Sequence, residues 1–114
     1  MTEDIINRIQ NRESFLLAAD GQFIGKLTTN IYDIESICNQ YGSFGSRYSV
    51  TSIWNQYSQY GSKYAIFSAY NQYTATPPVI YLRGVQYGYL TKNNYMFNRV
   101  DPDNILSWMQ QNYL

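Results

Sequence analysis

The sequence predicts an α+β fold: two related β-hairpins in a small antiparallel sheet, central 16-residue repeats of short helices and turns, and terminal helices. Two matching hairpin signals, one internal repeat and a strongly capped C-terminal segment predict it. The chain has 114 residues, which fits a single domain with one core. We expect an N-terminal helix over 1–13, hairpins over 14–30 and 79–93, the repeats over 33–76 and a C-terminal helix over 101–113.

The first segment has the features of a short helix. Thr2 can accept a hydrogen bond from a free amide of the first turn, and two acidic residues follow it where the helix dipole is positive. Ile5, Ile6 and Ile9 are spaced to share one face. This face predicts a helix that packs on the rest of the domain.

Two dipeptides predict hairpin turns. Asp20-Gly21 separates SFLLAA from QFIGKLT, and Arg83-Gly84 separates VIYL from VQYGYLT. Such pairs suit the type I′ turn, in which both central residues have positive φ. The two segments are therefore predicted to be two copies of one hairpin, neighbours in one sheet.

The two hairpins also carry a glycine at the same place in their second strand. The segments that begin at Gly21 and Gly84 align without a gap, and this alignment superimposes Gly25 on Gly88. A glycine inside a strand indicates a bulge or a close approach of another backbone.

The C-terminal segment is the clearest helix. Asp101 is the expected cap, Pro102 suits the first helical position, and Asp103 suits the positive end of the helix dipole. Ile105, Trp108, Met109 and Asn112 or Tyr113 mark one face, anchored by Ile105 and Trp108, which we expect to cover the sheet.

The centre of the chain is an internal repeat. Ser36, Ser52 and Ser68 begin, at equal intervals, the units SICNQYGSFGSRYSVT, SIWNQYSQYGSKYAIF and SAYNQYTATPP. The SxxNQY half is predicted to be a short helix from its apolar pairs at helical spacing, and the glycine-containing half a turn into an extended piece. Aliphatic residues are few here, so an aromatic core is expected, with asparagines as partners of nearby backbone groups.

The pattern NxYGxYGSxYSxxSIWNxY, preceded by DGxFxGxLT and followed by GYLT and a DP-led helix, resembles a family of small bacterial proteins of unknown function. The resemblance covers about residues 20–108. The chain departs from the regular pattern at Ser58, where a glycine is expected, and at Cys38, where an aromatic is expected. The resemblance implies no activity.

Charge is segregated along the chain although the net charge is zero. Residues 36–100 contain no acidic residue and five basic ones, while both ends are acidic. Zero net charge gives little self-repulsion, which favours self-association.

A ligand-binding face is one interpretation of the repeat. Tyrosine rings stack on bases or sugars, and amides bond to their edges. Arg47 and Lys63 recur at one repeat position and could contact anionic groups. The predicted ligand-binding residues are Arg47, Lys63, Tyr48, Tyr64, Asn39, Asn55 and Asn71. The alternative, favoured by the regular spacing of the aromatics, is that the tyrosines form the core.

The sequence offers no catalytic set, metal site or cofactor motif. It has no histidine, and its single cysteine excludes an intrachain disulfide. Cys38 aligns with Trp54 and Tyr70, which predicts a buried apolar role. The acidic pairs Asp33/Glu35 and Asp101/Asp103 are explained as helix caps.

The function that fits these observations best is a non-enzymatic protein-interaction module with a capacity for self-association. Its partner would be another protein or a second copy of the chain, held by exposed tyrosines. The alternative is a binder of a small ligand or nucleic acid that uses the basic, Tyr/Asn-rich repeat segment. No membrane role is expected, because the longest apolar run, 15–19, is far too short to span a bilayer. No secretory signal is recognised, so a cytoplasmic location is predicted.

Overall fold

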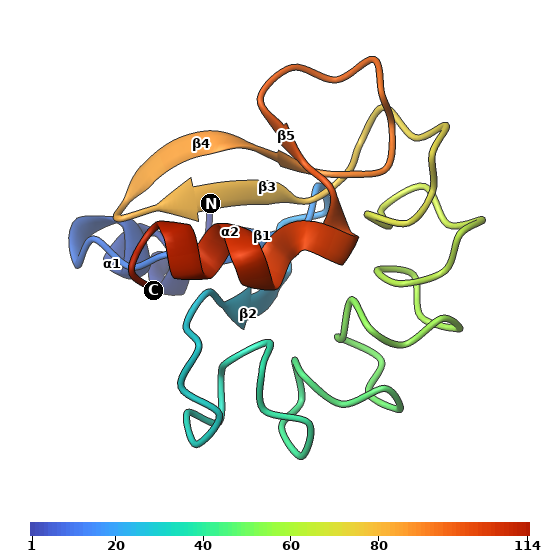
Figure 1. The fold of residues 1–114 in the computed structure, drawn as a ribbon. Coiled ribbons are helices and arrows are strands. Elements are labelled where there is room, and N and C mark those ends of the chain that lie inside the picture. The colour runs from blue at the N-terminus through green and yellow to red at the C-terminus, as the bar shows by residue number, and fades with distance from the viewer.

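The computed structural model describes all 114 residues and contains helices at both ends of the chain and a five-stranded sheet. In chain order the elements are α1 (Glu3–Gln10), β1 (Phe15–Leu17), β2 (Phe23–Lys26), β3 (Val79–Leu82), β4 (Val85–Leu90), β5 (Arg99–Val100), the 3-10 helix η1 (Pro102–Asn104) and α2 (Ile105–Gln111). The predicted α+β class, with a small sheet and terminal helices, is confirmed (Figure 1).

The strands lie in the order β2-β1-β3-β4-β5. The hairpins β1–β2 and β3–β4 are neighbours through the antiparallel pair of β1 and β3, as the sequence predicts. The sheet is nevertheless mixed rather than purely antiparallel, because β5 runs parallel to β4. Residues 91–98 make the crossover between these two strands.

The two hairpin turns differ. Arg83 and Gly84 have φ values of 50° and 81°, which matches the predicted type I′ turn. In the turn of the first hairpin Gly21 has positive φ but Asp20 does not, so the same prediction for Asp20-Gly21 is wrong. Ala18 accepts a hydrogen bond from the Gly21 amide and donates one to the Gln22 carbonyl. This is the longer, three-residue loop in which a glycine follows the turn.

The glycine prediction is confirmed in both hairpins. The register shifts in β1–β2 and in β3–β4, which marks a bulge beside each glycine. A Cβ atom at Gly25 would collide with Ile37 of the repeat, and one at Gly88 would collide with the carbonyl of Asn98. The absence of a side chain at these two glycines therefore allows Ile37 and the backbone of Asn98 to pack directly against the strands.

The terminal helices are capped as predicted. Thr2 accepts a hydrogen bond from the Ile5 amide at 3.3 Å, and Asp101 accepts one from the Asp103 amide at 2.9 Å. In α1 only Ile5 is fully buried, and Ile6 is exposed, so the predicted three-residue face is too wide.

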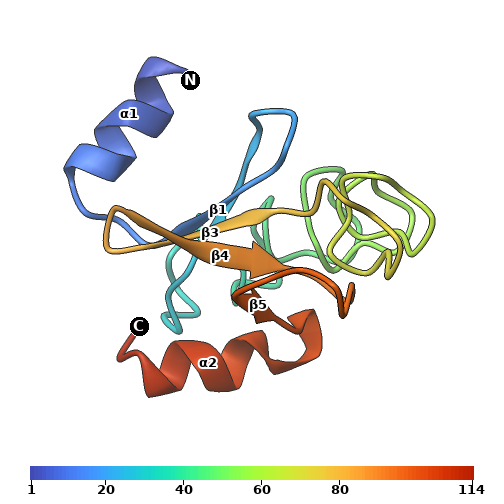
Figure 2. The ribbon, with the colours of Figure 1, turned by 90° about the horizontal axis from the view of Figure 1, so that it is seen from above.

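The predicted apolar face of α2 is confirmed, but Met109 rather than Trp108 is its second fully buried anchor. Ile105 and Met109 are fully buried, whereas Trp108 is half-buried and packs edge-on against Tyr87. The helix covers one side of the sheet as expected (Figure 2).

Side chains along each strand point alternately to the two faces of the sheet, and each face packs into its own apolar layer. Leu16, Ile24 and Ile80 belong to the larger core, which also contains the buried residues of α2. Their neighbours Phe15, Phe23 and Tyr81 belong to a smaller core that contains Ile5 of α1. Figure 2 shows α1 and α2 on opposite sides of the sheet. Successive residues of a strand point to opposite faces, so one short sheet supports both layers.

The central repeat is a chain of turns without helix or strand, so the predicted short helices are wrong. From Asn30 to Thr74 the amide at each turn end donates to the carbonyl three residues earlier. In each of the first two units one amide, that of Ser46 or Ser62, donates instead to the carbonyl four residues earlier. Four turns that advance the chain by three residues and one that advances it by four make up the period of the repeat. We call residues 30–76 the turn arc, which curves around the end of α2 (Figure 1).

Serine and asparagine side chains explain why turns replace helix. In almost every turn the first residue accepts a hydrogen bond from the amide two residues later, as Ser52 does from Trp54 at 3.0 Å. Asn55 does the same for Tyr57 and also donates to the carbonyl of Ser49. These local bonds compete with helical ones and close each turn separately. Asn39 and Asn71 repeat both bonds, which confirms the predicted role of the asparagines as backbone partners.

The arc buries small residues and exposes most of its tyrosines. Its inner face consists of Ser36, Ser52 and Ser68 and of the residues that follow them, Ile37, Ile53 and Ala69, all at most 2% exposed. The expectation of an aromatic core is therefore wrong for most tyrosines, whereas Trp54 and Phe67 pack against the larger core and Phe44 against the smaller one. The narrow inner face of the arc accepts serines and aliphatic side chains, and Tyr60 is the buried tyrosine there.

Hydrogen bonds fix both ends of the arc to the sheet. At the start of the arc, the Lys26 amide in β2 donates to the Glu35 carbonyl, and the Lys26 carbonyl accepts from the Ile37 amide. Near its other end, the Lys92 amide donates to the Ala69 carbonyl. The hydroxyl of Tyr60 donates to Asp20 at 2.7 Å, which ties the second unit to the first hairpin.

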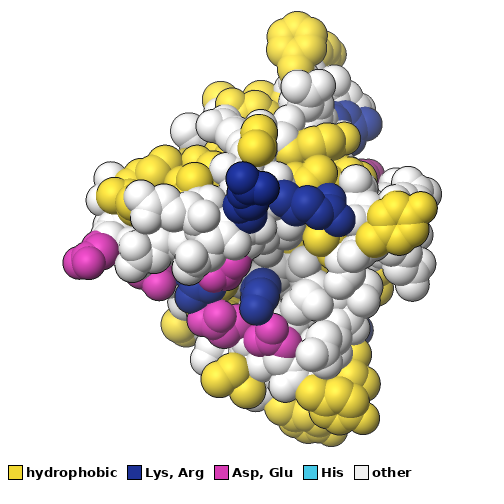
Figure 3. All heavy atoms as spheres, turned by 90° about the vertical axis from the view of Figure 1, so that its left-hand side faces the viewer, with side chains coloured by type: hydrophobic (Ala, Val, Ile, Leu, Met, Phe, Trp, Pro, Cys, Tyr) yellow, Lys and Arg dark blue, Asp and Glu magenta, His cyan; other side chains and the backbone are white.

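Arg8 fastens α1 to the start of the arc. Its guanidinium pairs with Asp4, Glu13 and Glu35 at 2.7–3.0 Å and lies 3.8 Å from the ring centroid of Phe23. The hydrogen bond from Arg8 to Glu35 raises the pKa of the guanidinium further above its already high value. Figure 3 shows basic and acidic side chains close together on the side of the molecule that carries α1.

None of the helices has the length and apolar character needed to cross a bilayer.

Candidate binding surface

Two rows of tyrosines point into solvent along the turn arc. Each row has the period of the repeat: Tyr32, Tyr48 and Tyr64 form one row, and Tyr41, Tyr57 and Tyr73 form the other. All six are at least 80% exposed. We call them the tyrosine rows. Large rings left in water at regular intervals offer apolar surface to a partner at low entropic cost.

A third exposed row is aliphatic. Ile34, Val50 and Ile66 are 76%, 76% and 64% exposed and share the same period. We call them the aliphatic row. Exposed apolar side chains scattered singly are ordinary, whereas these three recur at the period of the repeat.

Between neighbouring units the arc is hollowed into pockets. The first-unit pocket has a volume of about 770 Å³ and the second-unit pocket about 620 Å³. Seven residues of the first pocket have a counterpart one repeat later in the second: Ile37/Ile53, Cys38/Trp54, Gln40/Gln56, Gly45/Gly61, Arg47/Lys63, Tyr48/Tyr64 and Trp54/Tyr70. The repeat therefore builds the same pocket twice, and α2 borders the first through Leu106 and Gln110.

The predicted site residues are partly brought together. Arg47 and Tyr48 line the first-unit pocket, and Lys63 and Tyr64 line the second. Neither cation forms an ion pair within the protein, and the Lys63 ammonium lies 5.2 Å from the Tyr64 ring centroid. Each pocket thus holds one cation beside an exposed ring, and Tyr57 adds a second exposed ring to the second-unit pocket.

The three predicted asparagines occupy other positions. Asn39 and Asn55 line neither of these two pockets, and their amides bond to the backbone of the arc. Asn71 borders a third hollow of about 800 Å³ at the end of the arc, although its amide is also bonded to backbone.

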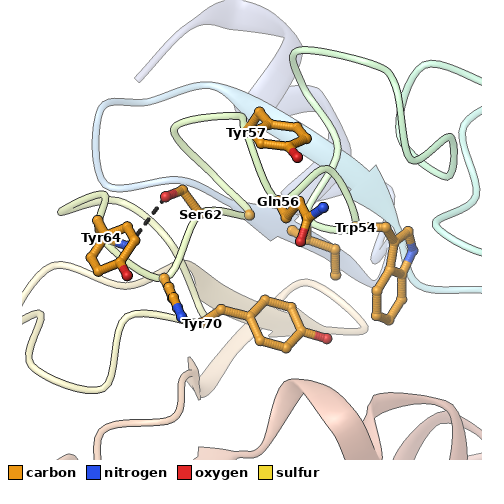
Figure 4. A pocket seen from close by; sticks show the side chains of 9 residues that line it. Trp54, Gln56, Tyr57, Ser62, Tyr64 and Tyr70 are labelled. Atoms are coloured by element: carbon orange, nitrogen blue, oxygen red, sulfur yellow. Dashed lines mark hydrogen bonds between the residues drawn. The ribbon is translucent and has the colours of Figure 1, made fainter.

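Sequence reasoning missed Gln40, Gln56 and Trp54 as lining residues. Trp54 borders both pockets, and its indole N–H donates to the carbonyl of Ile37 at 2.8 Å, which fixes the ring between two units. Figure 4 shows the amide of Gln56 between Tyr57 and Trp54, with the ring of Tyr70 extending toward Trp54. The signal was the recurrence of the glutamines at the repeat period, which the alignment of the units contains.

Two tyrosines of the arc have perturbed hydroxyls. Burial and the hydrogen bond to Asp20 raise the pKa of Tyr60. Burial and the nearby carboxylate of Asp103 raise the pKa of Tyr70, whose hydroxyl donates to Asp103 at 3.3 Å. Both groups stay protonated well above neutral pH, so they serve as hydrogen-bond donors and not as bases.

Cys38 is predicted to be buried, but it is half-buried and lines the first-unit pocket. Burial raises the pKa of its thiol, which disfavours the reactive thiolate. Asp33 accepts a hydrogen bond from the amide of Glu35, but it begins a turn and not a helix. The predicted placement of acids at a helix N-terminus therefore holds for Asp101 and Asp103 but not for Asp33 and Glu35.

No three side chains of the metal-binding types lie close enough together to hold an ion. The sequence matches no protein-family model, no curated protein and no solved structure. The resemblance to a family of small bacterial proteins therefore remains a prediction.

Proposed function

We propose that this chain is a non-enzymatic protein-interaction module that associates with copies of itself through the outer surface of the turn arc. The observation that carries the proposal is the aliphatic row, whose members are 64–76% exposed at a constant spacing. The second tyrosine row has the same period, and its rings are 84–90% exposed. Burial of such rows against another protein removes apolar surface from water, which is the main driving force of association.

Charge supports the same proposal. The net charge is zero, so two copies meet without strong repulsion. Residues 36–100 carry no acid, whereas both ends of the chain are acidic, so the arc of one copy can face the acidic end of another. The cytoplasmic location and bacterial origin suggested by the sequence belong to this proposal, and cell fractionation tests the former.

The test is the mass of the particle in solution. Light scattering coupled to size exclusion, over a hundredfold range of concentration, is expected to give a multiple of 13.3 kDa that falls toward one chain on dilution. The variant Ile34→Thr/Val50→Thr/Ile66→Thr keeps the branched shape and is expected to be monomeric. The matched control is Ile6→Thr, which changes an exposed isoleucine of α1. A wild-type chain that stays monomeric at every concentration would contradict the proposal.

A second candidate is the binding of a small ligand or nucleic acid at the pockets. It is supported by Arg47 and Lys63, which recur in equivalent pockets beside exposed rings. Titration with a single-stranded oligonucleotide at two salt concentrations tests it. Binding that weakens steeply with salt supports the nucleic-acid form.

A further inference from the structure

Equivalent pockets at a fixed spacing suit a ligand that repeats. The first-unit and second-unit pockets share seven equivalent positions, and Trp54 forms a wall of both. A third hollow continues the series through Tyr70 and Gln72, the counterparts of Trp54 and Gln56. A compact ligand would need only one such pocket. A linear polymer can place one unit in each and gain affinity from simultaneous contacts.

The charges of the pockets are positive and sparse. Arg47 and Lys63 have no acidic partner, and residues 36–100 supply no carboxylate to oppose them. The third hollow contains Lys92, but its ammonium pairs with Asp101 at 2.9 Å and with Asp103. The pockets therefore offer two free cations, Arg47 in the first-unit pocket and Lys63 in the second-unit pocket. Lys63 also borders the third hollow, whose own cation, Lys92, is neutralised.

The remaining lining groups suit rings that carry hydroxyl groups. The amides of Gln40 and Gln56 make no hydrogen bond within the protein and can both donate and accept. Tyr48 and Tyr64 present their ring faces and hydroxyls at 92% and 80% exposure. A saccharide unit offers an apolar ring face to an aromatic side chain and hydroxyls to an amide.

We propose that the two pockets bind a linear acidic glycan, with an anionic group of the polymer at Arg47 and another at Lys63. Nucleic acid fits less well, because it carries a phosphate on every nucleotide. The two pockets contain only two free cations, and the chain has no net positive charge. The inference does not rest on self-association: the aliphatic row, which carries that proposal, lines neither pocket, and Tyr57 is the one member of the second tyrosine row that lines either of them.

Tryptophan fluorescence reports on the site directly. In the background Trp108→Phe, Trp54 is the remaining tryptophan, and it touches both pockets. Oligosaccharides of galacturonate, glucuronate and mannuronate, each from one to ten units, are titrated at low salt. At least one acidic series is expected to change the emission, with affinity that rises with length and levels off once two pockets are spanned.

The decisive variant is Arg47→Gln/Lys63→Gln, which keeps polar side chains at two exposed positions. It is expected to weaken binding by about tenfold for each lost charge-assisted contact. The matched control Arg12→Gln removes an exposed cation outside the pockets and is expected to bind like the parent chain. Circular dichroism checks that every variant is folded.

Four results would overturn the proposal. They are equal binding of a neutral malto-oligosaccharide, equal binding of polyglutamate, tighter binding of oligothymidylate, and no spectral change with any acidic series. Polyglutamate separates simple charge attraction from recognition of the saccharide ring, and oligothymidylate separates glycan from nucleic acid. Because Ile34→Thr/Val50→Thr/Ile66→Thr leaves the pocket residues unchanged, it is expected to bind glycan normally, so failure of one proposal is distinguishable from failure of the other.

Discussion

Asn55 combines a buried position with two hydrogen bonds that hold the second unit of the arc. Its amide donates to the Ser49 carbonyl at 3.0 Å, and its oxygen accepts from the Tyr57 amide at 3.0 Å. Every buried side-chain nitrogen and oxygen of the protein has a partner, so the loss of one such side chain leaves polar groups unpaired.

Asn55→Ala is expected to lower the free energy of unfolding by about 1–3 kcal/mol, because it leaves a carbonyl and an amide unpaired. Urea denaturation followed by circular dichroism measures it. Gln59→Ala changes an exposed neighbour in the same unit and is expected to stay within about 0.5 kcal/mol of wild type. Equal stability of the two variants would contradict this account of the arc.

Tyr60 gives a prediction with a defined pH dependence. Its folded pKa is raised above the ordinary value of about 10, so its contribution to stability is fully present below pH 10 and is lost as the pH rises toward the folded pKa. Tyr60→Phe is expected to destabilise the protein by about 1 kcal/mol near neutral pH and to make the alkaline decline shallower. Thermal unfolding between about pH 7 and 11 measures both effects. An unchanged alkaline slope would show that Tyr60 is not the cause of the decline.

Within the elements, the turn arc depends on glycines that bring two turns close together. At Gly61 an added Cβ would lie 2.7 Å from the Ile53 carbonyl and would overlap that of Asn55. Gly45 meets the carbonyl of Asn39 in the equivalent way. Backbone atoms cannot yield as a flexible side chain does.

Gly61→Ala and Gly45→Ala are each expected to cost about 3 kcal/mol or more, as overpacking of a rigid site does. Differential scanning calorimetry measures the loss of stability. Comparing the two variants tests whether the two units contribute equally to it. Ser43→Ala, at an exposed position of the arc, is the control. A loss below about 1 kcal/mol at both glycines would mean that the backbone of the arc adjusts without large strain.

For the whole molecule, two ion pairs join the arc to the sheet and the crossover to the C-terminal helix. Lys26 pairs with Asp33 at 3.1 Å, and Lys92 pairs with Asp101 at 2.9 Å. The hydrogen bond from the Glu35 amide is the largest cause that lowers the pKa of Asp33. Lys26 lowers this pKa further, although burial raises it. Burial also raises the pKa of Asp101, but the bonds from Lys92 and the Asp103 amide lower it overall.

Because both folded pKa values lie below the ordinary 3.8, the stability from these carboxylates is present above about pH 4 and is lost as the pH falls through the folded values. Asp33→Asn/Asp101→Asn is expected to reduce the slope of stability against pH between about 5 and 2. Urea midpoints across this range measure it. Glu3→Gln, which changes an exposed carboxylate of α1 that forms no ion pair, serves as the control. A slope equal to that of wild type would assign the acid loss to other groups.

Local sequence signals determined much of this fold. Caps at Thr2 and Asp101 placed the terminal helices, and Arg83-Gly84 placed a turn, because each acts within a few residues. The period of Ser36, Ser52 and Ser68 also determined which positions are equivalent, and hence that Arg47 and Lys63 recur in like surroundings.

Only the tertiary structure decided which way the repeat faces. Tyrosine and isoleucine suit a core in composition, yet the arc turns Tyr41, Val50 and Tyr57 outward and buries Ser52. The reason is geometric: the successive turns bring Ser52 and Ile53 together to the inner side of the arc and leave Val50 and Tyr57 on the outer side, and the inner side has room for small and aliphatic residues. Pockets between units, and the parallel pairing of β5, arise from contacts between distant segments, which no local pattern encodes.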